Sequence, residues 1–278
     1  MQPERAQNPV SISATPITRI IHKPYYDLPS TITVMRQLQD SVDGFEIQNL
    51  GEWNRESPPK DDVTGTRYTA WKKSSKYTVE EVAVLLEGLP ILSVHANRDV
   101  GIYLCSNKKE DINRGKTLIH ESLFLAEKVG ASVCVFHLWD TWKSDFDITF
   151  LQGLLEEISC QYPDVKAAVE NVPTHAERVT PFDLVKGVEW VTLDMRWAAM
   201  YDELGRFESV KDQIVNVHLR GQLHNNKWKL TQAPFEFYEG LGIIRTWGYQ
   251  GVLTMEPEGN LSESTLENLV AAMASVRQ

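Results

Sequence analysis

The sequence has few cysteines and no long apolar run, and both shortages narrow the class of protein. Its three cysteines, Cys105, Cys134 and Cys160, are far apart and form no CxxC pair. This argues against a disulfide scaffold and against a cysteine zinc site, and it suits a reducing, cytoplasmic location. No run of about 18 apolar residues occurs, so we expect no membrane-spanning helix.

Positive charge is also scarce. The chain has 28 Lys and Arg against 38 Asp and Glu, a net charge of −10, so nucleic acid is a disfavoured partner. Residues 1–16 lack the apolar stretch of a secretion signal, and we expect them to form a flexible tail. No GxGxxG motif follows the first expected strand, which weakens a dinucleotide-binding interpretation.

The sequence is rich in short β-forming runs that alternate with longer helical patterns. The eight expected strands are residues 17–22, 44–48, 91–95, 132–137, 165–170, 190–194, 214–218 and 252–256. The expected helices between and after them are residues 78–89, 108–129, 145–160, 181–186, 200–211, 234–247 and 264–276. This alternation predicts an α/β fold with a parallel sheet, and the strand count favours a single-domain (β/α)8 TIM barrel over residues 17–278.

Capping signals support several of these helix boundaries. Thr78 suits an N-cap, and Gly130 and Gly248 suit helix C-terminal ends. Ser264 and Glu267 have the spacing of a capping box at the start of the last helix.

Each of the last six expected strands ends on an ionisable residue. These residues are His95, His137, Glu170, Asp194, His218 and Glu256. They are 24 to 42 residues apart, close to the length of one βα unit. The carboxyl ends of parallel strands meet at one rim of a barrel, where barrel active sites lie. One such residue means little, because most strand-end histidines are ordinary hydrogen-bonded residues, but six in succession predict a site.

Burying several of these charges without partners would be costly. A divalent cation would remove that cost, and so would ion pairing with Arg196, Arg220 or Lys166. The sequence leaves both solutions open, and we favour the cation.

Short motifs in this order resemble the xylose isomerase-like TIM barrel superfamily. They are GFEIQ at 44–48, SVHA at 93–96, AEKVGA at 126–131, VFH at 135–137, VEN at 169–171, TLD at 192–194, NVHLRG at 216–221 and GVLTMEPEG at 251–259. The superfamily includes sugar isomerases, ketose 3-epimerases, inosose dehydratases and endonuclease-four-like repair enzymes. The resemblance covers roughly residues 40–276 and implies the barrel fold.

The resemblance implies a metal-dependent isomerase or epimerase that acts on a sugar or sugar phosphate through an enediolate. It implies four metal ligands, Glu170, Asp194, His218 and Glu256. Glu170 and Glu256 would also move protons. Three carboxylates and an imidazole suit Mn2+, Mg2+ or Co2+, and Zn2+ is compatible. The expected substrate-binding residues are Glu46, Gln48, His95, His137, Trp197 and Arg220.

The sequence departs from the superfamily pattern at two places. Trp197 stands where epimerases commonly have a histidine three positions after Asp194, and Gly221 follows Arg220 where an acid is frequent. The alternatives are therefore a polyol dehydratase, an endonuclease-four-like phosphodiesterase with an incomplete metal cluster, and a non-catalytic ligand-binding barrel. Members often form dimers or tetramers, and the sequence leaves a homo-oligomer open.

Aromatic and basic residues are expected around the same rim. Trp53, Trp139, Trp142 and Trp197 fall in or near loops that follow strands. They would either stack on a sugar or pack between loops. The long loop over residues 50–77 is a candidate lid, and its basic residues would either attract a phosphorylated sugar or form a solvated surface.

Overall fold

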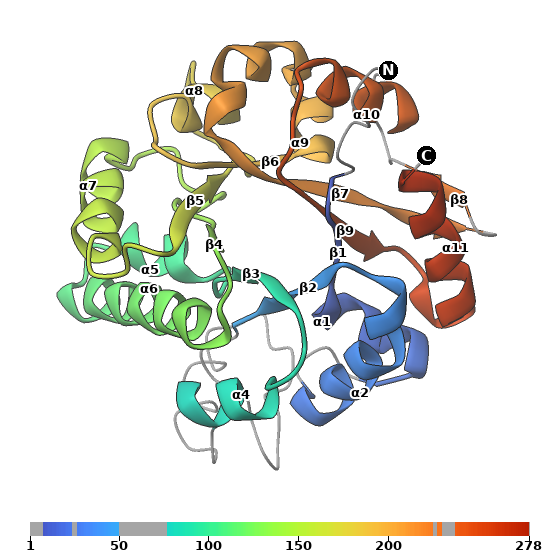
Figure 1. Cartoon of the computed structure of the whole chain (residues 1–278). Coiled ribbons are helices and arrows are strands. Elements are labelled where there is room, and N and C mark those ends of the chain that lie inside the picture. The colour runs from blue at the N-terminus through green and yellow to red at the C-terminus, as the bar shows by residue number, and fades with distance from the viewer. Residues whose placement is uncertain (1–7, 24–26, 50–76, 225–226, 230–236, 278) are drawn as a thin grey trace.

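The computed structural model describes residues 8–23, 27–49, 77–224, 227–229 and 237–277. Eight parallel strands close into a ring in the order β1-β2-β3-β4-β5-β6-β7-β9, with β9 pairing back to β1 (Figure 1). The strands are β1 Val10–Ser13, β2 Gly44–Gln48, β3 Ile91–His95, β4 Val133–Phe136, β5 Lys166–Glu170, β6 Val191–Asp194, β7 Ile214–His224 and β9 Val252–Glu258. The predicted single-domain (β/α)8 architecture is confirmed.

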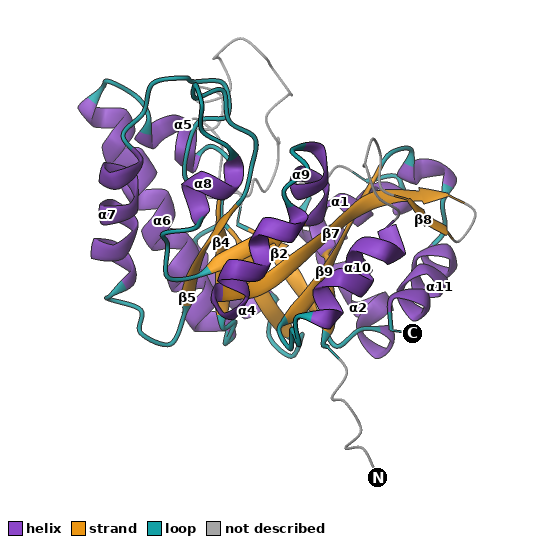
Figure 2. Cartoon of the chain, turned by 90° about the horizontal axis from the view of Figure 1, so that it is seen from above, coloured by secondary structure: helices purple, strands orange, loops and turns teal. Residues whose placement is uncertain are grey.

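Helices surround the ring and bury its outer face (Figure 2). The α-helices are α1 Ala14–Ile17, α2 Leu28–Leu38, α4 Val79–Leu85, α5 Val100–Leu104, α6 Lys109–Val129, α7 Ile148–Ser159, α8 Pro181–Val185, α9 Met195–Met200, α10 Phe237–Thr246 and α11 Leu266–Val276. The 3-10 helices are η1 Thr18–Ile21, η2 Gln39–Ser41, η3 Leu204–Gln213 and η4 Leu261–Glu263. A short strand, β8 (Lys227–Lys229), pairs antiparallel with the end of β7. No helix in the described ranges has the length and apolarity needed to cross a membrane.

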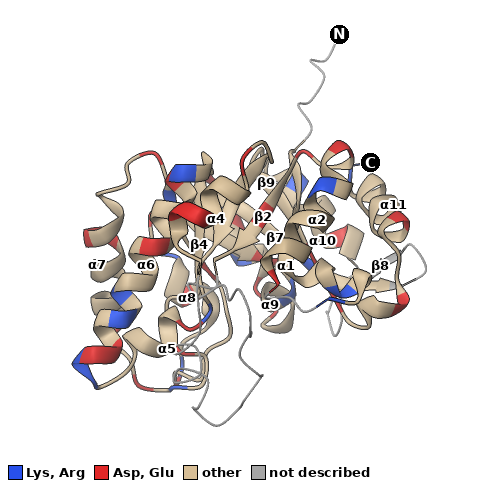
Figure 3. Cartoon of the chain, turned by 90° about the horizontal axis from the view of Figure 1, so that it is seen from below, with Lys and Arg blue, Asp and Glu red and all other residues tan. Residues whose placement is uncertain are grey.

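The long outer helix α6 shows why the sequence forms these elements. Its buried residues, which include Leu118, Leu125 and Ala126, recur at helical spacing. Acidic and basic residues, among them Glu110, Lys116 and Glu127, occupy many of its remaining positions (Figure 3). The helix ends as predicted at Gly130, whose φ of 72° is a left-handed conformation that glycine adopts without strain.

The first predicted strand is wrong. Residues 17–22 lie mainly in α1 and η1, and the first barrel strand is Val10–Ser13. Ile17, Ile20 and Ile21 have the 3–4 spacing of a helix, and the first two of them are buried. The barrel therefore begins within the segment expected to be a tail. Residues 1–7 of that segment lie outside the described residues.

Other helix boundaries also differ from expectation. The helix α2 was not predicted, although Asp27 caps it by accepting a hydrogen bond from the Ser30 amide. The region expected as one helix over residues 200–211 holds the end of α9 and then η3. The last helix uses a capping box one residue later than expected, formed by Thr265 and Asn268.

Inside the barrel, a buried polar layer lies directly below the strand ends. Its residues precede the strand-end positions by two, so they point inward from the same strands. Ser11 bonds Thr254 at 2.8 Å, and Thr254 donates to the Asn216 side-chain oxygen at 2.8 Å. Asn216 and Ser93 both donate to the Glu46 carboxylate. This layer holds Glu46 rigidly beneath the rim.

Candidate active site

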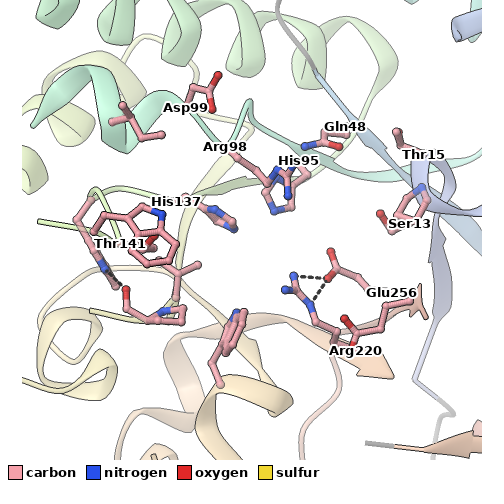
Figure 4. A pocket seen from close by; sticks show the side chains of 18 of the residues that line it. Ser13, Thr15, Gln48, His95, Arg98, Asp99, His137, Thr141, Arg220 and Glu256 are labelled. Carbon is pink, nitrogen blue, oxygen red and sulfur yellow. Dashed lines mark hydrogen bonds and ion pairs between the residues drawn. The ribbon is translucent and has the colours of Figure 1, made fainter. Parts of the chain in front are cut away.

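A cavity of about 670 Å³ opens at the carboxyl ends of the strands. Six of the predicted site residues line it: Gln48, His95, His137, Arg220 and Glu256, which Figure 4 labels, and Trp197. The other four predicted residues, Glu46, Glu170, Asp194 and His218, are fully buried and form the layer behind the cavity wall. The structure thus brings the strand-end residues together, but only some of them are accessible to a ligand.

On one side of the site, three histidines surround a single carboxylate oxygen. Glu170 Oε2 lies 2.9 Å from His137 Nε2, 3.3 Å from His95 Nε2 and 3.5 Å from His218 Nδ1. His95 also directs Nδ1 at the Ala96 carbonyl oxygen, at 2.8 Å. That oxygen can only accept, so His95 Nδ1 carries a proton. We call these four residues, His95, His137, His218 and Glu170, the histidine side.

On the other side, one guanidinium contacts three carboxylates. Arg220 Nε lies 2.8 Å from Glu256 Oε2 and 3.1 Å from Asp194 Oδ2. Arg220 Nη2 lies 2.5 Å from Glu256 Oε2 and 3.8 Å from Glu170 Oε1. Figure 4 shows Arg220 and Glu256 across the cavity from His95 and His137. We call Arg220, Asp194 and Glu256 the arginine side.

Strand register and helix capping explain the arginine side. Arg220 on β7 and Glu256 on β9 are direct partners across the parallel pair. Asp194 ends β6 and caps α9, because its Oδ1 accepts from the amides of Arg196 and Trp197. The cap places the Trp197 ring 5.3 Å from the Arg220 guanidinium carbon, a cation–π distance.

Burial and charge oppose one another at these groups. Burial alone would raise the pKa of Glu256, but Arg220 and His218 lower it to about 2. Burial raises the pKa of Asp194 to about 7, and the charges of Glu170 and Glu256 add to that effect against the pull of Arg220. Burial would raise the pKa of Glu170, yet His137 and His218 hold it well below its usual range.

The pKa values of His137 and His218 shift in opposite directions. Burial lowers the pKa of His137 despite the nearby Glu170 charge. Burial would also lower the pKa of His218, but Glu46, Glu256 and Glu170 raise it well above its ordinary value. His137 is therefore neutral and His218 cationic at neutral pH.

Glu46 does not occupy the position expected of a substrate-binding residue. It is fully buried, and its Oε2 lies 3.2 Å from His218 Nε2. The structure therefore places Glu46 behind His218, where it orients the ring and stabilises its charge. Gln48, two residues further along β2, lines the cavity, whereas Glu46 does not.

The donor types suit a metal ion, but the arrangement of the four implied ligands does not. Two buried groups could each hold an ion on distance alone, because their ligand atoms lie within 4.8 Å of one another. These groups are His95, Glu170 and His218, and Glu46, His218 and Glu256. Asp194 belongs to neither. Arg220 contacts Asp194, Glu170 and Glu256 together, so these residues do not fit one shared ion in this structure.

The aromatic residues at the rim have different environments. Trp139 is buried and donates from Nε1 to the Pro173 carbonyl at 2.9 Å, so it mainly packs between loops. Trp142 is 81% exposed and stacks on His175 at 5.7 Å beside the cavity. Trp53 and all but the last residue of the expected lid over residues 50–77 lie outside the described residues.

Sequence reasoning missed several cavity residues. Ser13, Thr15 and Arg19 line the cavity from β1, α1 and η1, and they escaped notice because the first strand was misplaced. His175 was missed as well, because it lies in an irregular loop after β5. A serine-alternating VSIS run at residues 10–13 was the signal that could have located the first group.

No protein-family model and no curated protein matches the chain. Solved structures do resemble it. A sugar phosphate isomerase/epimerase from Parabacteroides distasonis has a TM-score of 0.62 at 14% identity, covering 99% of this chain and 97% of that one. The 3-keto-D-glucoside 4-epimerase of E. coli has a TM-score of 0.59 at 13% identity, and the match covers 98% of this chain and 99% of that one. A D-tagatose 3-epimerase-like protein has a TM-score of 0.60 at 18% identity, and the match covers 96% of this chain and 98% of that one. These likenesses confirm the predicted (β/α)8 barrel fold.

Proposed function

We propose that this chain is an isomerase or epimerase that moves a proton at a carbon next to the carbonyl group of a sugar or sugar phosphate, through an enediolate. The observation that carries the proposal is the pair of proton-accepting groups on opposite sides of one cavity. His137, directly after β4, and Glu256, on β9, line it from different sides, and each is held by charged partners. The similarity to sugar epimerase folds supports the same conclusion.

The histidine side moves one proton. Glu170 is fully buried, so it acts on a substrate through His137, whose Nε2 lies 2.9 Å away. A neutral His137 that bonds Glu170 through Nε2 keeps Nδ1 free to accept a proton. The Glu170 carboxylate then stabilises the imidazolium that forms, as a carboxylate behind a catalytic histidine does.

On the arginine side, Glu256 moves the second proton and Arg220 stabilises negative charge on the substrate. Glu256 has 11% of its side chain exposed and remains ionised beside Arg220. A proton taken from one face of the carbon and returned from the other gives an epimer, and return to the neighbouring carbon gives an isomer. Arg220, which also lines the cavity, stabilises the negative oxygen of the enediolate in between.

Other cavity residues bind the substrate. Gln48, His95 and Trp197 offer an amide, an imidazole and an aromatic face to sugar hydroxyl and C–H groups. The metal-dependent form of this reaction would need Arg220 to leave the carboxylates, so we assign no step to a metal.

Hydrogen exchange tests the proposal. Incubation in D2O with a panel of free and phosphorylated ketoses and inositol derivatives should exchange one carbon-bound hydrogen of the right substrate. His137→Gln and Glu256→Gln should each lower that rate by about 10²–10⁴-fold, the usual contribution of general acid–base catalysis. Ser262→Ala, at the 3-10 helix η4 outside the cavity, is a matched control that should retain the rate.

Two results would contradict the proposal. Cleavage of an abasic-site DNA duplex without any exchange would favour the phosphodiesterase alternative. A rise in melting temperature with a panel member, but no exchange and no conversion, would favour a ligand-binding barrel. The burial of Glu170 and the Arg220–Glu256 ion pair are the observations that favour this last alternative.

A further inference from the structure

We propose that Arg220 is a built-in cation that takes the place of a divalent metal, so that the buried carboxylates are neutralised without an ion. Its guanidinium lies within 4 Å of oxygens from Asp194, Glu170 and Glu256 at once. These are three of the four side chains that the superfamily resemblance assigns to the metal. The inference depends on this geometry and not on the proposed reaction.

The position of Arg220 is built into the fold. Arg220 follows His218 by two residues on β7, so both side chains point to the same face of the strand. The β7–β9 register puts it opposite Glu256, and Trp197 covers the guanidinium from α9. Trp197, which departs from the superfamily pattern after Asp194, and Arg220 are therefore one coupled feature.

The other two ion-pairing candidates, Arg196 and Lys166, are engaged elsewhere. Arg196 Nη1 pairs with Glu258 at 2.7 Å, and Lys166 lies over the Trp190 ring, 4.6 Å from its centroid. Of the three ion-pairing candidates that the sequence offered, Arg220 is the one that meets these carboxylates. A guanidinium remains charged at any ordinary pH, so this neutralisation does not depend on proton uptake.

Buried ligand atoms without hydrogen bonds remain beneath the guanidinium. Glu170 Oε1, Asp194 Oδ2 and His218 Nδ1 are buried, and none has a hydrogen-bond partner among the described residues. The two oxygens are close enough to Arg220 for charge attraction only. Removal of the guanidinium would leave the lone pairs of the two oxygens and a strong negative potential, which attract a divalent cation. His218 would lose its proton to bind that cation.

Metal binding by variants tests the inference without any substrate. Protein purified without chelator should contain far less than one divalent ion per chain, measured by elemental analysis. Titration calorimetry with Mn2+ should show weak binding to the wild type and binding at least about 100-fold tighter to Arg220→Ala, because a like charge a few ångströms away is gone. Arg220→Lys, which keeps the charge, and Arg196→Ala, which removes a different rim arginine, should bind no more tightly than the wild type.

A second substitution of Arg220 keeps the test valid if Arg220→Ala does not fold, and a double variant identifies a ligand of the ion. Arg220→Gln keeps most of the side-chain length and should gain Mn2+ affinity as Arg220→Ala does. Adding Glu170→Gln to either variant should abolish the gain, because Glu170 belongs to the buried group His95, Glu170 and His218, whose ligand atoms lie within 4.8 Å of one another. The inference is overturned if the wild type holds about one ion per chain, or if folded Arg220→Ala and Arg220→Gln bind Mn2+ no more tightly than the wild type.

Discussion

The histidine side and the arginine side neutralise neighbouring carboxylates by different chemistry. On the histidine side, imidazoles that can lose a proton surround Glu170 Oε2. On the arginine side, one guanidinium that cannot lose its proton holds Glu256 and Asp194. Glu170 joins the two, since its other oxygen lies 3.8 Å from Arg220. The first side is suited to proton transfer and the second to holding fixed charge.

The largest effect should come from removing the fixed charge. Arg220→Met keeps an apolar stem but leaves Glu256 and Asp194 buried without their cation. We expect the free energy of unfolding to fall by about 3–5 kcal/mol, the usual cost of breaking one partner of a buried ion pair. Denaturant unfolding with a chelator present measures this. A loss below about 1 kcal/mol would mean that the carboxylates are neutralised by some other group.

The second effect is the acid sensitivity of the arginine side. The pKa of Glu256 is lowered to about 2 in the fold, so its ionised form stabilises the protein above the unfolded pKa. That stabilisation is lost as the pH falls from about 4.5 to 2, and it amounts to at most about 3 kcal/mol. Unfolding free energies of the wild type and Glu256→Gln should therefore converge over this range. A constant difference between them would show that Arg220 does not act on Glu256.

A smaller effect is expected on the histidine side. His137 is neutral, because burial lowers its pKa, and its replacement removes one hydrogen bond and no charge. His137→Gln should therefore cost about 1–2 kcal/mol of unfolding free energy. The same denaturant measurement checks this value. A loss as large as that of Arg220→Met would erase the distinction between the two sides.

The smallest effect should come from the rim outside both sides. Arg196 pairs with Glu258, and both side chains are partly exposed, at 23% and 27%. Solvent screens such a pair, so Arg196→Ala should change the unfolding free energy by less than about 1 kcal/mol. A larger loss would indicate that the contact between Arg196 and Trp197 supports the arginine side.

The boundaries of the elements show where sequence reasoning succeeded and where it failed. Strands β2 and β3 lie where they were predicted, because compact β-rich runs bounded by turn signals have few alternatives. The first strand was misplaced because Val10–Ser13 is only four residues long and becomes a strand by pairing with β2 and β9. Short segments are decided by their neighbours, which local patterns do not contain.

By itself, the sequence determined that residues at strand ends would gather at one rim. The alternation of β and α units requires parallel strands, and parallel strands bring their carboxyl ends together.

Only the tertiary structure decided which cation meets the buried carboxylates. The sequence offered a metal or any of three basic side chains, because spacing does not record which strands become neighbours. The β7–β9 register sets Arg220 opposite Glu256, and the capping of α9 by Asp194 sets Trp197 over the guanidinium. Ion pairing at a buried site depends on distances of a few ångströms, and those exist only after the barrel has closed.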